Sequence, residues 1–327
     1  MTGEAQPVLS VRNLTVALRT PGGDLRPVDG VSFSLGDGEI FGLVGESGAG
    51  KSLTAASILN LLDPPARIAA GEVWFEGRRI DNLPANSMRE LRGRRIGWVV
   101  QNPAAALNPL KRIGDALVAT LTAHSAISPG DARRRSLELL EAVGIPDPEL
   151  RLEQYPHQFS GGMLQRVVIA MAIAHDPRLI IADEPTSALD VSTQLQIIEL
   201  LQGLVRERGI TVLLISHNIS LVAKICSRIA VIYAGRIVEI GPALPVISAP
   251  RHPYTQGLVQ SVPRLGSRQP MLTSIPGSAP RLSEMPPGCA FYPRCDRRVA
   301  ICAAQRPPLA ESIGRADACW VAQAERT

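Results

Sequence analysis

The N-terminal part of the chain alternates apolar and polar residues in a way that predicts strands joined by turns. Apolar residues alternate with polar ones along Val31–Leu35, and also along Leu9–Val16 with one break at Asn13, as in half-buried strands. Ile40–Val44 is a continuous apolar run, which is typical of a fully buried strand. After Lys51-Ser52 the apolar positions take helical spacing, which ends before Pro64-Pro65. A strand, a glycine-rich turn and a helix are therefore expected in direct succession.

The middle of the chain has a different pattern. Residues from about 103 to 178 have mostly helical spacing of apolar positions. Leu179–Ala182 and Thr211–Ile215 are predicted to be buried strands, with a helix over Thr193–Arg208 between them. Residues 229–240 are expected to form a hairpin. Strands that alternate with helices in this way predict an α/β fold with a parallel sheet.

The composition changes near Pro250, where prolines become frequent and the periodicity weakens. Four of the five cysteines lie beyond this point. We therefore expect one domain over residues 1–250, with a helical subdomain at about 103–178, and a small cysteine-containing C-terminal domain over 251–327.

Bulk properties narrow the possible functions. With 327 residues, 45% of them hydrophobic, the chain can bury a large core. The net charge of +4 is spread along the chain, and its densest group, Arg133–Arg135, is expected to be a solvated helix face, so no nucleic-acid partner is predicted. The N-terminus lacks the regions of a signal peptide, and no apolar run reaches the ~18 residues of a spanning helix. A cytosolic location is expected, with any membrane contact made through an embedded partner.

The glycine-rich turn carries the first chemical motif. Gly45–Ser52 matches G-x-x-x-x-G-K-[ST], and its position between a strand and a helix favours a phosphate site over a chance turn. Lys51 can reach the β- and γ-phosphates, and the Ser52 hydroxyl can hold Mg²⁺. The residues expected to bind nucleotide here are Gly45, Ser47, Gly48, Gly50, Lys51 and Ser52.

A second motif is the apolar strand that ends in Asp183-Glu184. Asp183 can lie beside the Mg²⁺, and Glu184 can polarise the attacking water. Phosphoryl transfer needs a base, a metal and a phosphate cradle, and little else from the protein. Alone, two acids at a strand end are more often surface residues; the neighbouring motifs favour the catalytic interpretation.

The sequence Ser160–Arg166, SGGMLQR, resembles the signature sequence of the ABC family of ATPases. The alternative interpretation is that Ser160 only caps a helix with a glycine-rich start. The resemblance implies the ABC-type P-loop fold with a helical subdomain, ATP and Mg²⁺ as ligands, and ATP hydrolysis. It also implies that Ser160, Gly161 and Gly162 contact the γ-phosphate of nucleotide held by a second ATPase subunit.

Further family landmarks occur in order. Gln101 resembles the glutamine that senses Mg²⁺ and couples to the membrane domains. Asp190 resembles the D-loop aspartate, and His217 the switch histidine, so that Glu184, His217 and Gln101 form the implied catalytic set. Leu18 stands where the family has an adenine-stacking aromatic residue. The resemblance implies that Leu18 binds nucleotide by covering the adenine face without stacking, so weak base selectivity is expected. Asn218 follows His217 where aspartate is usual.

Other features resemble the ATPases of dipeptide, oligopeptide and nickel importers: the Gln101–Pro109 region, Met163, and His252–Thr255, Ile275–Gly277 and Gly288–Cys295. Peptides are the favoured solute, with nickel or oligosaccharides as alternatives. The implied partners are two membrane permeases, a second ABC ATPase (a heterodimer is favoured over a homodimer) and an extracytoplasmic substrate-binding protein. The location would be peripheral, at the cytoplasmic face of the membrane. A soluble ABC-type ATPase is the rival interpretation, although it would be expected to carry coiled coils or tandem cassettes.

The cysteines near the C-terminus are spaced C-x5-C-x6-C-x16-C, at Cys289, Cys295, Cys302 and Cys319. Four thiolates can bind zinc or an iron–sulfur cluster, and the spacing does not decide between them. The family resemblance favours a [4Fe–4S] cluster, with zinc and unligated thiols as alternatives. Cys226 is expected to be buried and inert on a helical stretch.

Overall fold

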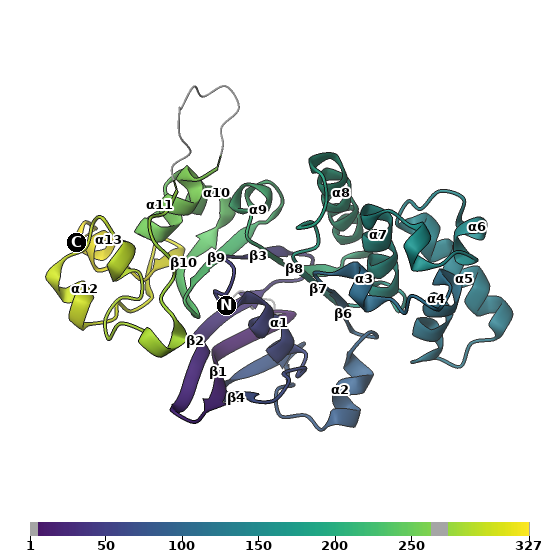
Figure 1. Cartoon of the computed structure of the whole chain (residues 1–327), viewed down its shortest axis with the longest axis horizontal. Helices are drawn as coiled ribbons and strands as arrows, with labels where there is room; N and C mark the ends of the chain where they lie inside the picture. Colours follow the sequence, from purple (N-terminus) through teal and green to yellow (C-terminus); the bar gives the residue numbers. More distant parts are fainter. Residues whose placement is uncertain (1–5, 263–273, 327) are drawn as a thin grey trace. The chain divides into compact units, whose positions relative to one another are not determined.

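The computed structural model describes residues 6–262 and 274–326 and divides into two compact units (Figure 1). Unit 1 contains residues 35–40 and 82–215, together with the described residues before Ser10. Unit 2 contains residues 10–34 and 41–81 and the described part of the chain from Ser216 onward. No helix among the described residues combines the length and apolar character needed to cross a bilayer.

Unit 1 is built on three parallel strands in the order β6-β7-β8: β6 (Ile96–Val99), β7 (Leu179–Asp183) and β8 (Thr211–Ser216). Leu179 lies opposite Ile96 on one side and Thr211 on the other. Every residue of β7 and β8 is buried, as expected when helices cover both faces of a parallel sheet. The predicted parallel arrangement of these strands is confirmed.

Helices fill the rest of Unit 1, and those between β6 and β7 confirm the predicted helical region. The helices are α2 (Ala85–Leu91), α3 (Pro103–Ala106), α4 (Ile113–Thr122), α5 (Pro129–Ala142), α6 (Pro148–Leu152), α7 (Gly161–Ala172), α8 (Val191–Arg208) and the 3₁₀ turn η1 (Pro156–Gln158). Helix α7, which begins with the signature residues, contacts α3, α4, α5 and α8.

Unit 2 contains two groups of strands. The first, in the order β2-β1-β4-β5, consists of β1 (Leu9–Thr20), β2 (Gly23–Leu35), β4 (Ala66–Phe75) and β5 (Arg78–Arg79). In the second, β3 (Ile40–Val44) runs parallel to β9 (Arg228–Tyr233), which pairs with β10 (Arg236–Pro242) in the predicted hairpin. Helix α1 (Lys51–Ile58) follows β3 through the glycine-rich turn, and α9 (Ile219–Ile225) precedes β9.

The C-terminal segment (residues 251–327) extends this second sheet. Strand β12 (Arg315–Asp317) pairs with β10, so that Asp317 lies opposite Glu239, and β11 (Ala310–Ser312) pairs with β12. The boundary predicted near residue 250 stays a prediction, although strands from both sides of it share one sheet. The other elements from Ala243 onward, coloured green to yellow in Figure 1, are α10 (Ala243–Ser248), α11 (Pro253–Gln260), η2 (Leu282–Glu284), η3 (Tyr292–Arg294), α12 (Ala300–Ala304) and α13 (Trp320–Ala324).

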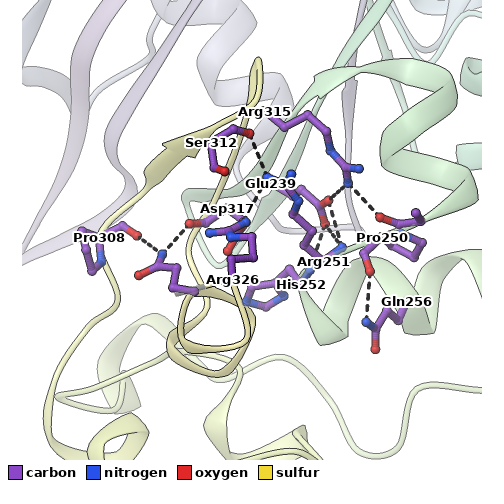
Figure 2. A network of polar contacts seen from close by, with 12 residues as sticks. Glu239, Pro250, Arg251, His252, Gln256, Pro308, Ser312, Arg315, Asp317 and Arg326 are labelled. Atoms are coloured by element: carbon purple, nitrogen blue, oxygen red, sulfur yellow. Dashed lines mark hydrogen bonds and ion pairs between the residues drawn. The ribbon is translucent and has the colours of Figure 1, made fainter.

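Buried charges join the C-terminal segment to β10 (Figure 2). Glu239 and Asp317 are both fully buried. Arg315 donates to Glu239 at 2.6 Å, and Arg326 and Arg251 pair with Asp317. Buried carboxylates are stable only when they are paired and hydrogen-bonded, so the pairing of β10 with β12 depends on these arginines.

His252 lies in the same network and is also buried. Its backbone N–H donates to Glu239 at 3.0 Å, and its Nδ1 accepts from the Tyr254 N–H at 3.0 Å, which caps α11. Burial lowers the pKa of His252 from its ordinary value of 6.5 to about 3. The ring is therefore neutral in the folded protein at any pH well above 3.

This pKa predicts how stability depends on pH. Between pH 3 and 6.5 the unfolded chain binds a proton at His252 that the folded chain does not, so stability is present above pH 6.5 and is lost as the pH falls. Lowering the pH from 7 to 5 should cost about 2 kcal/mol through this one site. His252→Asn keeps an acceptor that caps α11. Between pH 7 and pH 5 its free energy of unfolding should fall by about 2 kcal/mol less than that of the parent protein, measured by urea unfolding at both pH values. An equal loss in the two proteins would contradict the assignment.

Candidate nucleotide-binding site

The phosphate loop (Gly45–Ser52) joins β3 to α1 in Unit 2. Gly50 precedes α1 with φ 100°, and a Cβ there would lie 2.5 Å from the Pro27 carbonyl oxygen, so only glycine fits. The Gly235 N–H donates to the Ala49 oxygen at 3.0 Å and fixes the loop from the β9–β10 turn. Ser47, Gly48 and Ser52 are exposed, and Gly45 is buried.

Lys51 is folded back into this loop. Its side chain is buried, and Nζ donates to the carbonyl oxygens of Gly45 at 2.8 Å and Glu46 at 3.0 Å. The ammonium therefore lies close to the N-terminus of α1, the positive end of the helix dipole. Both features favour an anion, and the role of the motif residues in binding phosphate stays a prediction.

The predicted metal-binding and catalytic acids end β7 in Unit 1. Asp183 is buried, and Glu184 adopts a left-handed conformation with φ 46°. The Glu184 N–H donates to the Ile215 oxygen at 2.9 Å, which fixes the turn against the end of β8. Gln101 Nε2 donates to Glu184 Oε2 at 3.3 Å. The structure thus brings together Gln101 and Glu184, two residues that the sequence predicted separately.

The signature residues begin α7, also in Unit 1. Ser160 is the N-cap, and its Oγ accepts from the Met163 N–H at 3.3 Å, while Ser160 and Gly161 stay exposed. Ser160 thus caps the helix, as the alternative interpretation expected, and its predicted contact with nucleotide stays a prediction. A Cβ on Gly162 would lie 2.4 Å from Thr193 Cγ2, so this glycine is required by close packing on α8.

Asp190 has a structural role that the sequence did not predict. It caps α8, accepting from the Thr193 N–H at 3.0 Å and from Thr193 Oγ1 at 2.7 Å. Hydrogen bonds from Ser192 and Thr193 lower the pKa of Asp190 below its usual range. They also fix Thr193, whose methyl group packs on Gly162. An aspartate three residues before a threonine at a helix start is the signal that could have revealed this.

Comparison with known proteins shows the family. Residues 28–187 match the ABC transporter family, and residues 238–302 match the oligopeptide/dipeptide transporter C-terminal region. The chain is 48% identical to the dipeptide transport ATP-binding protein DppD of Bacillus subtilis over 91% of this chain and 89% of that protein. It is 44% identical to the oligopeptide transport ATP-binding protein OppD of Escherichia coli, over 97% and 94% of the two chains. The chain belongs to the ABC transporter ATP-binding proteins.

Solved structures agree with this assignment. An ABC cassette described as a dimer in a post-hydrolysis state, bound to ADP and Pi, superposes with a TM-score of 0.65 at 29% identity, covering 72% of this chain and 98% of that one. The cbiO1 protein of Clostridium perfringens gives 0.64 at 26% identity, over 74% and 91%. The predicted ABC-type α/β fold is confirmed, and the protein is an ABC ATPase.

The two departures from the ABC pattern lie in Unit 2. Asn218 caps α9, accepting from the N–H groups of Ser220 at 3.1 Å and Leu221 at 3.2 Å. Asparagine and aspartate cap helices about equally well, so the helix that follows the exposed His217 keeps its start. Leu18 is half-buried in β1, and its predicted role beside adenine stays a prediction.

The four C-terminal cysteines line one small cavity in Unit 2, of about 20 Å³. The Cys289 N–H donates to the Cys302 oxygen at 2.8 Å, and burial raises the pKa of Cys289 to about 11. Burial also raises the pKa values of Cys295 and Cys319. Within the described residues, no group of three or more His, Cys, Asp or Glu side chains is arranged to hold a metal ion. The iron–sulfur prediction therefore stays a prediction. Cys226 is buried as predicted, but it follows α9, which ends at Ile225.

The packing of Gly162 yields a matched pair of variants. Gly162→Ala should destabilise the protein by about 1–3 kcal/mol, because the new methyl group overlaps Thr193. Gly161→Ala is the control: its Cβ would meet only Leu189, at 3.6 Å, and stability should change by less than about 1 kcal/mol. Thr193→Ala combined with Gly162→Ala should recover part of the loss. Urea unfolding measures all three variants, and equal stabilities of Gly161→Ala and Gly162→Ala would refute the packing argument.

Proposed function

We propose that this chain is the subunit that hydrolyses ATP to power peptide import through an ABC transporter. The observation that carries the proposal is that the chain matches both the ABC family and the oligopeptide/dipeptide transporter C-terminal region. Relatives named as dipeptide and oligopeptide transport ATP-binding proteins, similar over most of their length, support peptides over nickel or oligosaccharides.

The phosphate loop would bind the triphosphate. Lys51 would pair with the β- and γ-phosphates, and the loop's N–H groups would bind their oxygens; these residues are Gly45, Ser47, Gly48, Gly50, Lys51 and Ser52. Leu18 would cover one face of the base without stacking. His217 would contact the γ-phosphate from the end of β8.

Hydrolysis would depend on Glu184 as the general base for water. The hydrogen bond from Gln101 supports the orientation of the Glu184 carboxylate, and Glu184 has a positive φ in the turn that follows β7. Asp183, Ser52 and Gln101 offer the carboxylate, hydroxyl and amide oxygens that Mg²⁺ prefers. When bound, Mg²⁺ would neutralise the charge that develops on the phosphates.

The exposed signature residues at the start of α7 support the proposed partners of this chain. Ser160, Gly161 and Gly162 would contact the γ-phosphate held by a second ABC ATPase, and Asp190 would fix α8 behind them. Two permease subunits would dock near α3, which contacts the signature helix α7 and is followed by Leu110, 85% exposed. An extracytoplasmic binding protein would deliver the solute, and this chain would lie at the cytoplasmic face of the membrane.

Glu184→Gln tests this assignment. An amide cannot take a proton from water, so hydrolysis should fall by ~10²–10⁴-fold while ATP binding is kept. In vesicles that contain the assembled transporter, Glu184→Gln should also abolish the uptake of labelled peptide. Glu199→Gln, an exposed glutamate of α8, is the matched control and should leave both activities unchanged. Normal hydrolysis by Glu184→Gln would refute the choice of base, and uptake of nickel without peptide would refute the solute.

We further propose that Cys289, Cys295, Cys302 and Cys319 bind a [4Fe–4S] cluster. The support is the donor set, since the four thiols surround one cavity with Phe291 and Trp320. The cavity has room for about one water molecule, so the segments that carry the four cysteines must move apart for a cluster to bind. Its role would be structural or redox-sensing, with no part in hydrolysis.

Anaerobic purification tests the cluster. The full-length protein should be brown and contain about four irons per chain. Cys295→Ser should remove the colour and make the C-terminal segment more sensitive to proteolysis, whereas Cys226→Ala should keep both. Protein that contains zinc, or no metal, would overturn the proposal.

A further inference from the structure

The C-terminal segment contacts the phosphate loop within Unit 2 through a partly buried ion pair. Arg294 lies in the turn between Cys289 and Cys295, and Glu46 is the second residue of the loop. The guanidinium binds the carboxylate in a two-point geometry, with Nη1 2.9 Å from Oε2 and Nη2 3.1 Å from Oε1. Only 6% of the Arg294 side chain and 29% of the Glu46 side chain are exposed, so water and salt screen this pair only in part.

The rest of the Arg294 environment is built to hold it in place. Its Nε donates to the Pro276 oxygen at 2.8 Å, and Nη1 lies 3.4 Å from the Tyr233 hydroxyl. The guanidinium carbon lies 5.8 Å from the ring centres of both Tyr233 and Phe291. An arginine with this many partners has one orientation, and that orientation directs it at Glu46.

A second contact holds the Glu46 backbone. The Glu46 N–H donates to the Tyr254 hydroxyl at 2.8 Å, and Tyr254 is fully buried. Tyr254 is the second residue of α11, and its own N–H donates to His252, which Glu239 holds in the network of Figure 2. Both the side chain and the amide of Glu46 are therefore fixed by residues outside the loop.

Glu46 in turn holds the part of the loop that would meet phosphate. Its carbonyl oxygen accepts from Lys51 Nζ at 3.0 Å and from the Ala49 N–H at 3.2 Å. A shift of Glu46 would move the acceptor that orients the Lys51 ammonium. We propose that Arg294 and Tyr254 are positioning residues for ATP binding, so that the C-terminal segment sets the nucleotide affinity of the phosphate loop. This inference rests on the proposed role of that loop.

The competing interpretation is that the pair only anchors the C-terminal segment. The two can be separated, because an anchor would affect stability and proteolysis but not nucleotide affinity at temperatures where the protein is folded. Positioning predicts an effect on affinity with little effect on the rate at saturating ATP.

The test uses the full-length chain and calorimetric titration with a non-hydrolysable ATP analogue. Arg294→Gln should weaken binding about tenfold, and Tyr254→Phe, which keeps the ring and loses only the hydroxyl, about threefold. Glu46→Gln should weaken binding about as much as Arg294→Gln does. The double variant Glu46→Gln/Arg294→Gln should bind the analogue no more weakly than either single variant, because each substitution removes the same interaction. In the assembled transporter, KM for ATP should rise while kcat changes less than about twofold.

Arg298→Gln and Tyr292→Phe are the matched controls. Arg298 is exposed over the Tyr292 ring, 5.6 Å from its centre, in the same part of the C-terminal segment, and both controls should bind the analogue as the parent does. The inference would be overturned if Arg294→Gln and Tyr254→Phe bound the analogue as tightly as the parent. It would also be overturned if the losses of affinity in Glu46→Gln and Arg294→Gln multiplied in their double variant. Absence of binding by the parent protein would instead refute the proposed function.

Discussion

The close approach of three backbone segments is the constraint on which the phosphate loop depends. A Cβ on Gly45 would lie 2.2 Å from the Ile232 oxygen, and one on Gly235 would lie 2.6 Å from the Pro27 oxygen. The backbones of the loop, of β9 with the turn that follows it, and of β2 at Pro27 therefore approach one another closely. This contact leaves the loop few conformations, and the hydrogen bond from Gly235 to Ala49 selects one of them.

Local patterns in the sequence predicted the elements and the motifs well, because each depends on residues close together in the chain. The strands at Ile40–Val44 and Thr211–Ile215, the helical region and the hairpin all follow from periodicity. The phosphate and signature motifs were recognisable for the same reason. Each is a short stretch whose residue types are fixed by backbone geometry.

Contacts between distant positions could not be predicted. Glu46 and Arg294 are 248 residues apart, and either alone reads as an ordinary surface charge. The pairing of β10 with β12 was also hidden, because a strand of three residues, Arg315–Asp317, has no periodicity to detect. The spacing of the cysteines likewise did not show how close the thiols are, since that distance is set by the turns between them.

The burial of Lys51 has a consequence for how fast and how tightly an anion can bind. Its ammonium exchanges water for two carbonyl oxygens when the chain folds, so most of its dehydration is complete before a ligand arrives. Its long side chain has also lost most of its rotational freedom by then. The ammonium is thus already buried and oriented before any anion binds, so binding an anion needs little rearrangement of solvent around it.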